Sequence, residues 1–253
     1  MKKIIYFISD FFAEEVAGGA ELVDAQVIKH FQETGHDVFK IHSYETEQIL
    51  KTSNKQAFYI VSNFTGMSDK SKEFLKSKRF IIYEHDHKYL TTRDPSRFPN
   101  YKAPNHAIIN KDFYQSAQNV LCQSKKHKQV VSLNLGLDNI INLECSLWSD
   151  QEISVLKKNC NNKKQKQICI FNSKNEIKGT RESIDYCEKN NLEFDLVGNL
   201  PYNELMKKIS NYEKVVFFPK VLESFSRLAV EARILNCKLI ANNNLGCASE
   251  PWF

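Results

Sequence analysis

The chain has 253 residues, 42% of them hydrophobic and 11% aromatic. This composition excludes a disordered tail and allows one large domain or two of about 125 residues. Lys and Arg exceed Asp and Glu by only five charges, and residues 151 to 253, with 16 basic and 12 acidic side chains, carry four of them, which suits a phosphate-bearing ligand and argues against a nucleic-acid partner.

Short apolar runs alternate with helix-like segments, which is the pattern of parallel sheets covered by helices. The first half predicts strands at Lys3–Ile8, Val38–His42, Phe58–Ser62, Phe80–Tyr83, Ala107–Ile109 and Val120–Cys122. A helix over Ala20–Glu33 separates the first two strands, because its apolar residues recur at helical spacing and Gly35 follows as a stop. The Lys-rich helix Asp69–Arg79 has a thin apolar face, so we interpret it as solvated, with peripheral membrane contact as the alternative.

The second half repeats this plan. Its predicted strands are Ile168–Asn172, Phe194–Val197, Lys214–Phe218 and Lys238–Ala241, and its predicted helices are Thr180–Lys189, Tyr202–Ser210 and Ser224–Leu235. Between the halves lies Gln151–Gln167, with a helical start and a polar tract from Asn159 onward that no core would accept. The sequence therefore predicts an α/β protein of two Rossmann-like lobes, residues 1–150 and 151–253, with a ligand cleft at the carboxyl ends of both sheets.

The most informative stretch follows the predicted strand Lys214–Phe218. A short loop delivers Glu223, and Ser224 is a good N-cap residue for the next helix. The first N–H groups of this helix would offer a natural seat for a diphosphate. They belong to Phe225, Ser226 and Arg227. Glu231 shares a stripe of the helix with Ser224, so we expect it to lie off the face that packs on the sheet.

These residues carry a resemblance. Glu223 and Glu231, separated by seven residues around a helix start and followed by a strand and a loop ending in Glu250-Pro251, resemble the donor-site signature of family 4 retaining glycosyltransferases. Gly18-Gly19-Ala20-Glu21 resembles the glycine-rich acceptor-side loop of that family, and Lys178-Gly179 resembles its diphosphate-binding lysine. The similarity spans nearly the whole chain.

The resemblance implies a GT-B enzyme of the hexosyltransferase type, with a nucleotide-diphosphate sugar in the second lobe and the acceptor in the first. Glu231 would accept hydrogen bonds from the ribose hydroxyls, and Glu223 would contact the transferred sugar. Lys178, with Lys174 competing for the role, would neutralise the leaving diphosphate together with the amides after Glu223. No metal or other cofactor would then be required, and the sequence has no Asp-x-Asp metal clamp.

The segment Glu84-His85-Asp86-His87 follows the predicted strand Phe80–Tyr83. Strand alternation would place the two histidines on one side and the two acids on the other, so one metal ion could not easily gather all four. The position suits an acid or base near the sugar, and family 4 enzymes often place a histidine in this part of the first lobe. We therefore expect His85 to be catalytic, with Asp86 as the second choice.

The acceptor side is expected to combine two loops of the first lobe. Lys88–Pro104 is interpreted as a long ordered loop over the cleft. The Gly18-Gly19 pair is either a flexible loop or a place of close backbone approach to a ligand. It does not match the GxGxxG fingerprint, which argues against a nicotinamide enzyme. The candidate acceptor-side residues are Gly18, Gly19, Glu21, Arg93 and Arg97.

The chain also departs from the family. Ser224 and Ser226 stand where glycines are usual, and Asn172-Ser173-Lys174 stands where a basic residue is usual just after the strand. The chain is unusually short, so we expect a minimal second lobe. The acceptor would be a glycan, a lipid-linked compound or a small molecule. The alternatives are a non-catalytic nucleotide-sugar-binding subunit and a GT-B-like nucleotide-sugar epimerase.

Cysteine usage and hydropathy predict the compartment. The seven cysteines are scattered without a Cys-x-x-Cys pair, which argues against a disulfide framework and a zinc ribbon. The apolar runs are far shorter than the roughly 20 residues that cross a bilayer, and Ser9 and Asp10 end the first run short of a signal-peptide core. We expect a cytoplasmic protein with reduced thiols and no transmembrane helix.

Overall fold

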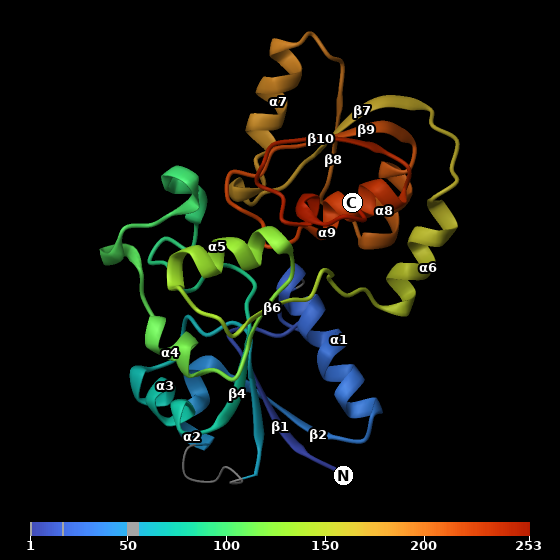
Figure 1. Ribbon diagram of the computed structural model, residues 1–253. Coiled ribbons are helices and arrows are strands. Elements are labelled where there is room, and N and C mark those ends of the chain that lie inside the picture. The colour runs from blue at the N-terminus through green and yellow to red at the C-terminus, as the bar shows by residue number, and fades with distance from the viewer. Residues whose placement is uncertain (1, 17, 50–55) are drawn as a thin grey trace. The chain divides into compact units, whose positions relative to one another are not determined.

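A computed structural model describes residues 2–16, 18–49 and 56–253 of the chain. The chain divides into two compact units, Met1–Leu147 and Trp148–Phe253. Each unit contains one parallel sheet with helices packed against it (Figure 1). The predicted α/β architecture of two parallel sheets flanked by helices is therefore confirmed.

The sheet of the first unit has the strand order β2-β1-β3-β4-β5-β6, and all its pairs are parallel. Its strands are β1 (Ile4–Ser9), β2 (Asp37–His42), β3 (Phe58–Val61), β4 (Arg79–Tyr83), β5 (Val120–Cys122) and β6 (Ile140–Asn142). Its helices are α1 (Gly19–Glu33), α2 (Thr46–Ile49), α3 (Asp69–Lys76), α4 (Lys111–Ser116) and α5 (Lys125–Leu135).

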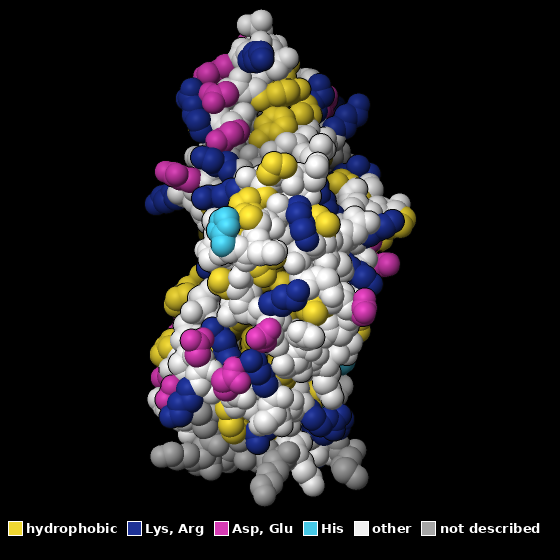
Figure 2. Space-filling model, turned by 60° about the vertical axis from the view of Figure 1, so that its left-hand side comes forward, with side chains coloured by type: hydrophobic (Ala, Val, Ile, Leu, Met, Phe, Trp, Pro, Cys, Tyr) yellow, Lys and Arg dark blue, Asp and Glu magenta, His cyan; other side chains and the backbone are white. Residues whose placement is uncertain are grey.

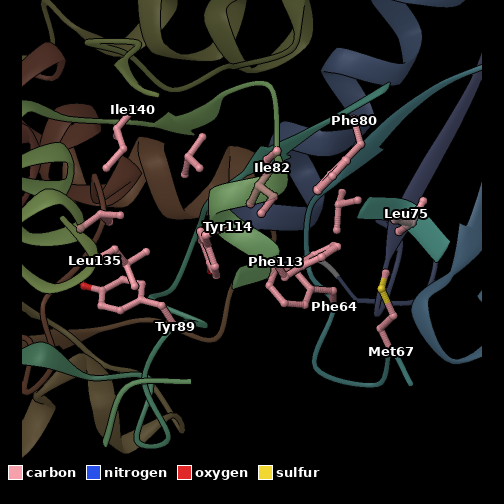
Figure 3. Packing of buried hydrophobic residues seen from close by; sticks show 14 of the residues in the cluster. Phe64, Met67, Leu75, Phe80, Ile82, Tyr89, Phe113, Tyr114, Leu135 and Ile140 are labelled. Atoms are coloured by element: carbon pink, nitrogen blue, oxygen red, sulfur yellow. The ribbon is translucent and has the colours of Figure 1, made fainter. Parts of the chain in front are cut away.

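Alternation along the strands fills a core on each face of this sheet. Ile5 and Phe7 of β1 pack with Val23 of α1 on one face. The other face carries the larger cluster, which Figure 3 shows with Phe80 of β4 close to Phe113 of α4. The rings of these two phenylalanines are stacked with their centroids 5.0 Å apart. Each fully buried side chain of this size contributes about 1.5–3 kcal/mol of hydrophobic stabilisation.

Three predictions for the first unit need correction. Ala107–Ile109 is not a strand, because Asn105–Ala107 forms a 3-10 turn and Ile108 makes only an isolated bridge with Leu90. The strand β6 was missed, because its apolar run is only Ile140-Ile141 between two asparagines. The helix predicted over Asp69–Arg79 ends at Lys76, because the chain turns at Ser77 and Arg79 already begins β4.

The sheet of the second unit has the parallel order β10-β9-β7-β8. Its strands are β7 (Lys166–Phe171), β8 (Asp195–Val197), β9 (Tyr212–Phe217) and β10 (Lys238–Ala241). Its helices are α6 (Asp150–Asn159), α7 (Thr180–Lys189), α8 (Tyr202–Ile209) and α9 (Arg227–Ile234). Short 3-10 helices of the whole chain are η1 (Ser43–Glu45), η2 (Pro95–Arg97), η3 (Pro99–Tyr101), η4 (Asn105–Ala107), η5 (Glu176–Lys178) and η6 (Cys247–Ser249).

The polar segment that precedes β7 is a packed part of the second unit. A capping box between Ser149 and Glu152 starts α6, and Leu156 of this helix is buried in the core of the unit. Lys164 donates to the carbonyl oxygens of Ser210 and Leu235, at 2.9 and 2.6 Å. These carbonyls lie at the ends of α8 and α9, where a cation is favoured. A tract that we expected no core to accept thus stabilises two helix ends.

Surface charge and thiols complete the description. Figure 2 shows Lys and Arg side chains interspersed with Asp and Glu side chains on one face. All seven cysteines lie in the described part of the chain, and none forms a disulfide. Among the described residues, no helix is long and apolar enough to cross a membrane.

Candidate functional site

In the second unit, two predicted site residues meet at the carboxyl ends of neighbouring strands. Lys178 ends η5 in the connection after β7, and Glu223 lies in the connection after β9. The Nζ atom of Lys178 is 2.7 Å from Oε1 of Glu223, and their side chains are 33% and 12% exposed. The residue expected to bind the diphosphate and the residue expected to contact the sugar therefore neutralise each other.

The backbone holds both partners of this ion pair. Gly179, directly after Lys178, has φ +66°, and an added Cβ would overlap the carbonyl oxygen of Phe218. The amide of Glu223 donates to the carbonyl of Asn244 at 2.9 Å, and its carbonyl accepts from Gly246 at 3.0 Å. The ion pair thus sits on a fixed frame.

Lys174, the alternative to Lys178, is exposed and takes no part in this ion pair.

The helix after Glu223 starts later than predicted. It begins at Arg227, and Ser226 occupies the N-cap position with φ +81°, without a side-chain capping bond. The chain before it is not helical, because Glu223 bridges Leu245 and the carbonyl of Phe225 accepts from the amide of Cys247 at 2.8 Å. The predicted N-cap at Ser224 and the predicted helical amides of Phe225 and Ser226 are therefore wrong.

The side chains of this connection are also more buried than expected. Phe225 is 2% exposed and packs against Trp148 and Trp252. Ser226 is buried in the left-handed region that glycine favours, and this is one of the positions where the resembling family has glycine.

Glu231 lies on the second turn of α9 and is only 5% exposed. Its Oε1 accepts from Nε1 of Trp148 at 2.8 Å and from the hydroxyl of Tyr202 at 3.2 Å. Burial raises the pKa of Glu231, and the charge of Arg227 partly opposes this shift. Glu231 is nevertheless buried, because it bonds Trp148 and Tyr202.

Arg227 turns toward protein carboxylates. Its guanidinium contacts Glu152 and lies 3.6 Å from Oε1 of Glu231. It also sits over the ring of Trp148, 5.2 Å from the centroid. The Arg227 side chain is 10% exposed and faces two acids and one indole, while its Nη1 atom is buried without a hydrogen-bond partner. Its backbone N–H group lies at the start of α9.

In the first unit, His85 is paired with an acid that the sequence analysis did not identify. Its Nε2 lies 3.1 Å from Oδ1 of Asp24, which is fully buried on α1 and also accepts from Oγ of Ser9 at 3.4 Å. The ring of His85 lies against Tyr83, with centroids 4.5 Å apart. Asp24 directly follows Val23 on the apolar face of the predicted helix. A carboxylate in that position could have indicated a buried polar contact.

Asp86 is held in an ion network and is not an available base. Its Oδ1 accepts from Nζ of Lys88 at 2.8 Å, and Arg93 contacts its other oxygen. Lys88 is almost fully buried and also bonds Oε1 of Glu84 at 3.0 Å. The predicted acceptor residue Arg93 is therefore the partner of the second-choice catalytic residue.

The alternation expected for residues 84 to 87 is also wrong. The strand β4 ends at Tyr83, and His87 has φ +59°. His87 contacts the hydroxyl of Tyr89 and the ring of His127 rather than the partners of His85. Within the described residues, no group of three or more His, Cys, Asp or Glu could hold a metal ion.

The remaining acceptor-side candidates lie at the start of α1 and in the loop after β4. Gly18 is the N-cap of α1, and an added Cβ would overlap the carboxylate of Glu21, whereas Gly19 has open space. Burial raises the pKa of Glu21, whose Oε1 lies 3.5 Å from Nδ2 of Asn63. Arg97 is 65% exposed and pairs with Asp94 at 3.5 Å.

Comparison with known proteins identifies the fold. No protein-family model matches the chain, and no curated protein matches its sequence. HepE of Anabaena in complex with UDP is similar in structure, with a TM-score of 0.55, 13% identity, and coverage of 97% of this chain and 82% of that one. The chain has the GT-B glycosyltransferase fold.

Two further solved structures agree. An α-glucosyltransferase in complex with UDP and DNA has a TM-score of 0.54 at 12% identity, covering 99% of this chain and 85% of that one. The catalytic domain of starch synthase IV from Arabidopsis thaliana, bound to ADP and acarbose, has a TM-score of 0.57 at 11% identity, covering 98% and 84%. The resemblance seen in the sequence is confirmed as far as this fold.

Proposed function

We propose that this protein is a glycosyltransferase that moves a sugar from a nucleotide-diphosphate sugar to a hydroxyl group of an acceptor. The observation that carries the proposal is the ion pair of Lys178 and Glu223 after neighbouring strands of the second sheet, just before α9. On a GT-B fold, a cation and a carboxylate at this edge of the second sheet support binding of a donor with a charged diphosphate and a polar sugar. The UDP and ADP in the similar structures support the same donor class.

In this proposal, the second unit binds the donor. Lys178 neutralises the charge that develops on the departing diphosphate, because a fixed ammonium group stabilises that charge more in the transition state than in the bound donor. The backbone N–H groups of the first turn of α9, which begins at Arg227, add to this effect. Glu223 contacts the transferred sugar and Glu231 binds the ribose.

The first unit supplies the acceptor side. Asp24, as a carboxylate, only accepts hydrogen bonds, so the Nε2 atom of His85 carries the proton of their contact. Nδ1 of His85 then keeps a lone pair, with which the ring orients the acceptor hydroxyl or accepts its proton. We propose transfer with retention of configuration, as in the family that the sequence resembles. Acceptors are glycans, lipid-linked compounds or small molecules, and no nucleic acid.

Turnover measurements with candidate donors test this proposal. We expect UDP-glucose or ADP-glucose to raise the melting temperature, and the matching nucleoside diphosphate to be released faster when sugar acceptors are added. Both effects should persist in EDTA, because Lys178 and the helix amides take the place of a metal ion. Donor binding without any turnover would favour a non-catalytic binding subunit, and binding restored only by manganese would contradict the metal-free mechanism.

A further inference from the structure

The two oxygens of the Glu231 carboxylate differ in the number of hydrogen-bond donors that they contact. Two donors converge on Oε1, namely Nε1 of Trp148 at 2.8 Å and the hydroxyl of Tyr202 at 3.2 Å, and the guanidinium of Arg227 lies 3.6 Å from the same atom. No described residue donates a hydrogen bond to Oε2. This oxygen is not fully buried, because it is absent from the set of fully buried atoms that lack a partner. An ionised carboxylate can accept hydrogen bonds on both oxygens, so Oε2 has acceptor capacity that the protein does not use.

The first donor, Trp148, is held by two neighbouring side chains. Arg227 lies over the indole at 5.2 Å, and the ring of Phe225 meets it at 6.3 Å in an edge-on arrangement. The next residue, Ser149, is locked in the capping box of α6. The direction of the indole N–H is therefore set before any ligand binds.

The second donor, Tyr202, is the first residue of α8. Burial raises the pKa of its hydroxyl further above the usual range, and the nearby charge of Glu231 adds to this shift. The hydroxyl therefore keeps its proton and acts as a donor to Glu231. Together, the two residues restrict the carboxylate to one orientation.

We propose that Trp148 and Tyr202 are positioning residues, which hold Glu231 by Oε1 so that Oε2 accepts hydrogen bonds from the ribose hydroxyls of the bound nucleotide. This inference rests on the proposed function. A neighbouring pair of hydroxyls supplies the donors that Oε2 lacks, and a carboxylate ordered in advance loses little conformational freedom when they bind. A nucleotide without these hydroxyls leaves Oε2 unpaired and binds more weakly.

Calorimetric titration with UDP, ADP and their 2′,3′-dideoxy forms tests the inference. The measured quantity is the ribose preference, which is the dissociation constant of the dideoxy form divided by that of the parent nucleotide. For the wild type we expect a preference of about tenfold or more with at least one base, as for a hydrogen bond to a charged acceptor. Tyr202→Phe and Trp148→Phe should each reduce it by about threefold or more, while binding of the dideoxy forms changes little.

Tyr212→Phe is the matched control, because it removes a tyrosine hydroxyl that donates to Asp195 at 2.8 Å elsewhere in the same unit. It should leave the ribose preference unchanged. Since the preference compares two ligands on the same variant, a modest loss of folded protein cancels from it. The two phenylalanine variants also remove different donors, so each checks the other.

The outcomes separate the inference from the proposed function. If the wild type binds the nucleotides with a ribose preference that both variants retain, the positioning role is overturned while the function stands. A wild type that binds without any ribose preference also overturns the inference. If neither UDP nor ADP, nor a sugar nucleotide of either, binds the wild type, the proposed function fails and the inference fails with it.

Discussion

Lys178 has two competing partners if the donor binds as proposed. In the structure it is neutralised by Glu223 at 2.7 Å, so a diphosphate must displace or share that contact. Glu223→Gln keeps the shape of the side chain but removes its charge. We expect this variant to bind pyrophosphate and UDP about twofold to fivefold more tightly, as for a partly exposed ion pair, and to lose transfer because its sugar contact is weakened.

Glu182→Gln is the control for this combination of tighter anion binding and lost transfer. It removes the charge of Glu182, which pairs with Lys220 at 3.3 Å elsewhere in the second unit. It should change neither pyrophosphate affinity nor transfer. Weaker pyrophosphate binding by Glu223→Gln in isothermal titration would show that Glu223 supports the anion site and does not compete with it.

The pairing of His85 with Asp24 predicts a loss of transfer without a loss of donor binding. His85→Ala and Asp24→Asn should each slow transfer about tenfold or more, because the ring either is absent or loses the carboxylate that sets its protonated nitrogen. Nucleoside diphosphate affinity should stay unchanged, since both residues lie in the first unit. Asp37→Asn, at an exposed aspartate paired with Lys2, is the control. Transfer that survives His85→Ala would remove His85 from the mechanism.

Glu84 makes the folding stability of the protein depend on pH in the acid range. Burial alone would raise its pKa, but Lys88, His127 and the hydroxyl of Tyr114 outweigh it and lower the pKa to about 2. The folded state thus binds this proton less readily than the unfolded chain. The stabilisation is complete above the unfolded value near 4.5 and is lost as the pH falls toward 2.

Urea unfolding between pH 7 and pH 3 measures this effect. Glu84→Gln should lose about 3 kcal/mol at pH 7, because it removes the fully buried one of the two carboxylates that pair with buried Lys88, and its stability should fall less steeply toward pH 3. Glu33→Gln, at an exposed pair with Lys29, should change stability by less than about 0.5 kcal/mol. Equal pH profiles for wild type and Glu84→Gln would show that other groups cause the acid response.

At the scale of elements, two glycines with nearly the same φ separate the cost of a left-handed backbone from the cost of a steric overlap. Gly179 has φ +66° and Gly136 has φ +64°, but an added Cβ overlaps the carbonyl of Phe218 only at Gly179. Gly136→Ala should therefore cost only about 1 kcal/mol for its left-handed conformation. Gly179→Ala should cost clearly more and should also displace the adjacent Lys178.

Denaturant unfolding of both variants measures the first part, and titration with pyrophosphate measures the second. Only Gly179→Ala should weaken the anion site. Equal unfolding free energies for the two variants would mean that the connection after β7 moves away from Phe218 without cost.

The start of α9 shows why local preferences were not sufficient to predict the site. Ser224 is a better N-cap residue than most, and the sequence alone favours it. In the structure, however, the backbone of Glu223 pairs with Asn244 and Gly246, and the helix begins only at Arg227. A pairing between segments about 20 residues apart overrides the local signal, and one sequence does not show such a pairing.

At the scale of the whole molecule, the α/β architecture was predictable because apolar runs in the sequence mark most of the buried parallel strands. Lys178 and Glu223 were predicted from a resemblance, and their contact of 2.7 Å was not. Asp24, Trp148 and Tyr202 were missed for one physical reason. Each bonds a partner distant in the sequence, and a single sequence does not show which partner a polar group meets.

The division of the molecule leads to a last prediction. The second unit has its own core, and this core includes Leu156 of α6. Trp148 and Glu152 also bind Glu231 and Arg227 within the same unit. A fragment of residues 148–253 should therefore unfold cooperatively in urea, as followed by circular dichroism. A fragment of residues 163–253, which keeps the whole sheet but lacks α6, should not.

The shorter fragment fails for a specific reason. Without Trp148 and Glu152, the buried side chains of Glu231 and Arg227 lose the partners that compensate for their burial, and the apolar surface that Leu156 covers is exposed. Leu156→Ala in the longer fragment isolates the apolar part and should cost about 2–5 kcal/mol. If the shorter fragment folds as stably as the longer one, α6 is a connection and not part of the second unit.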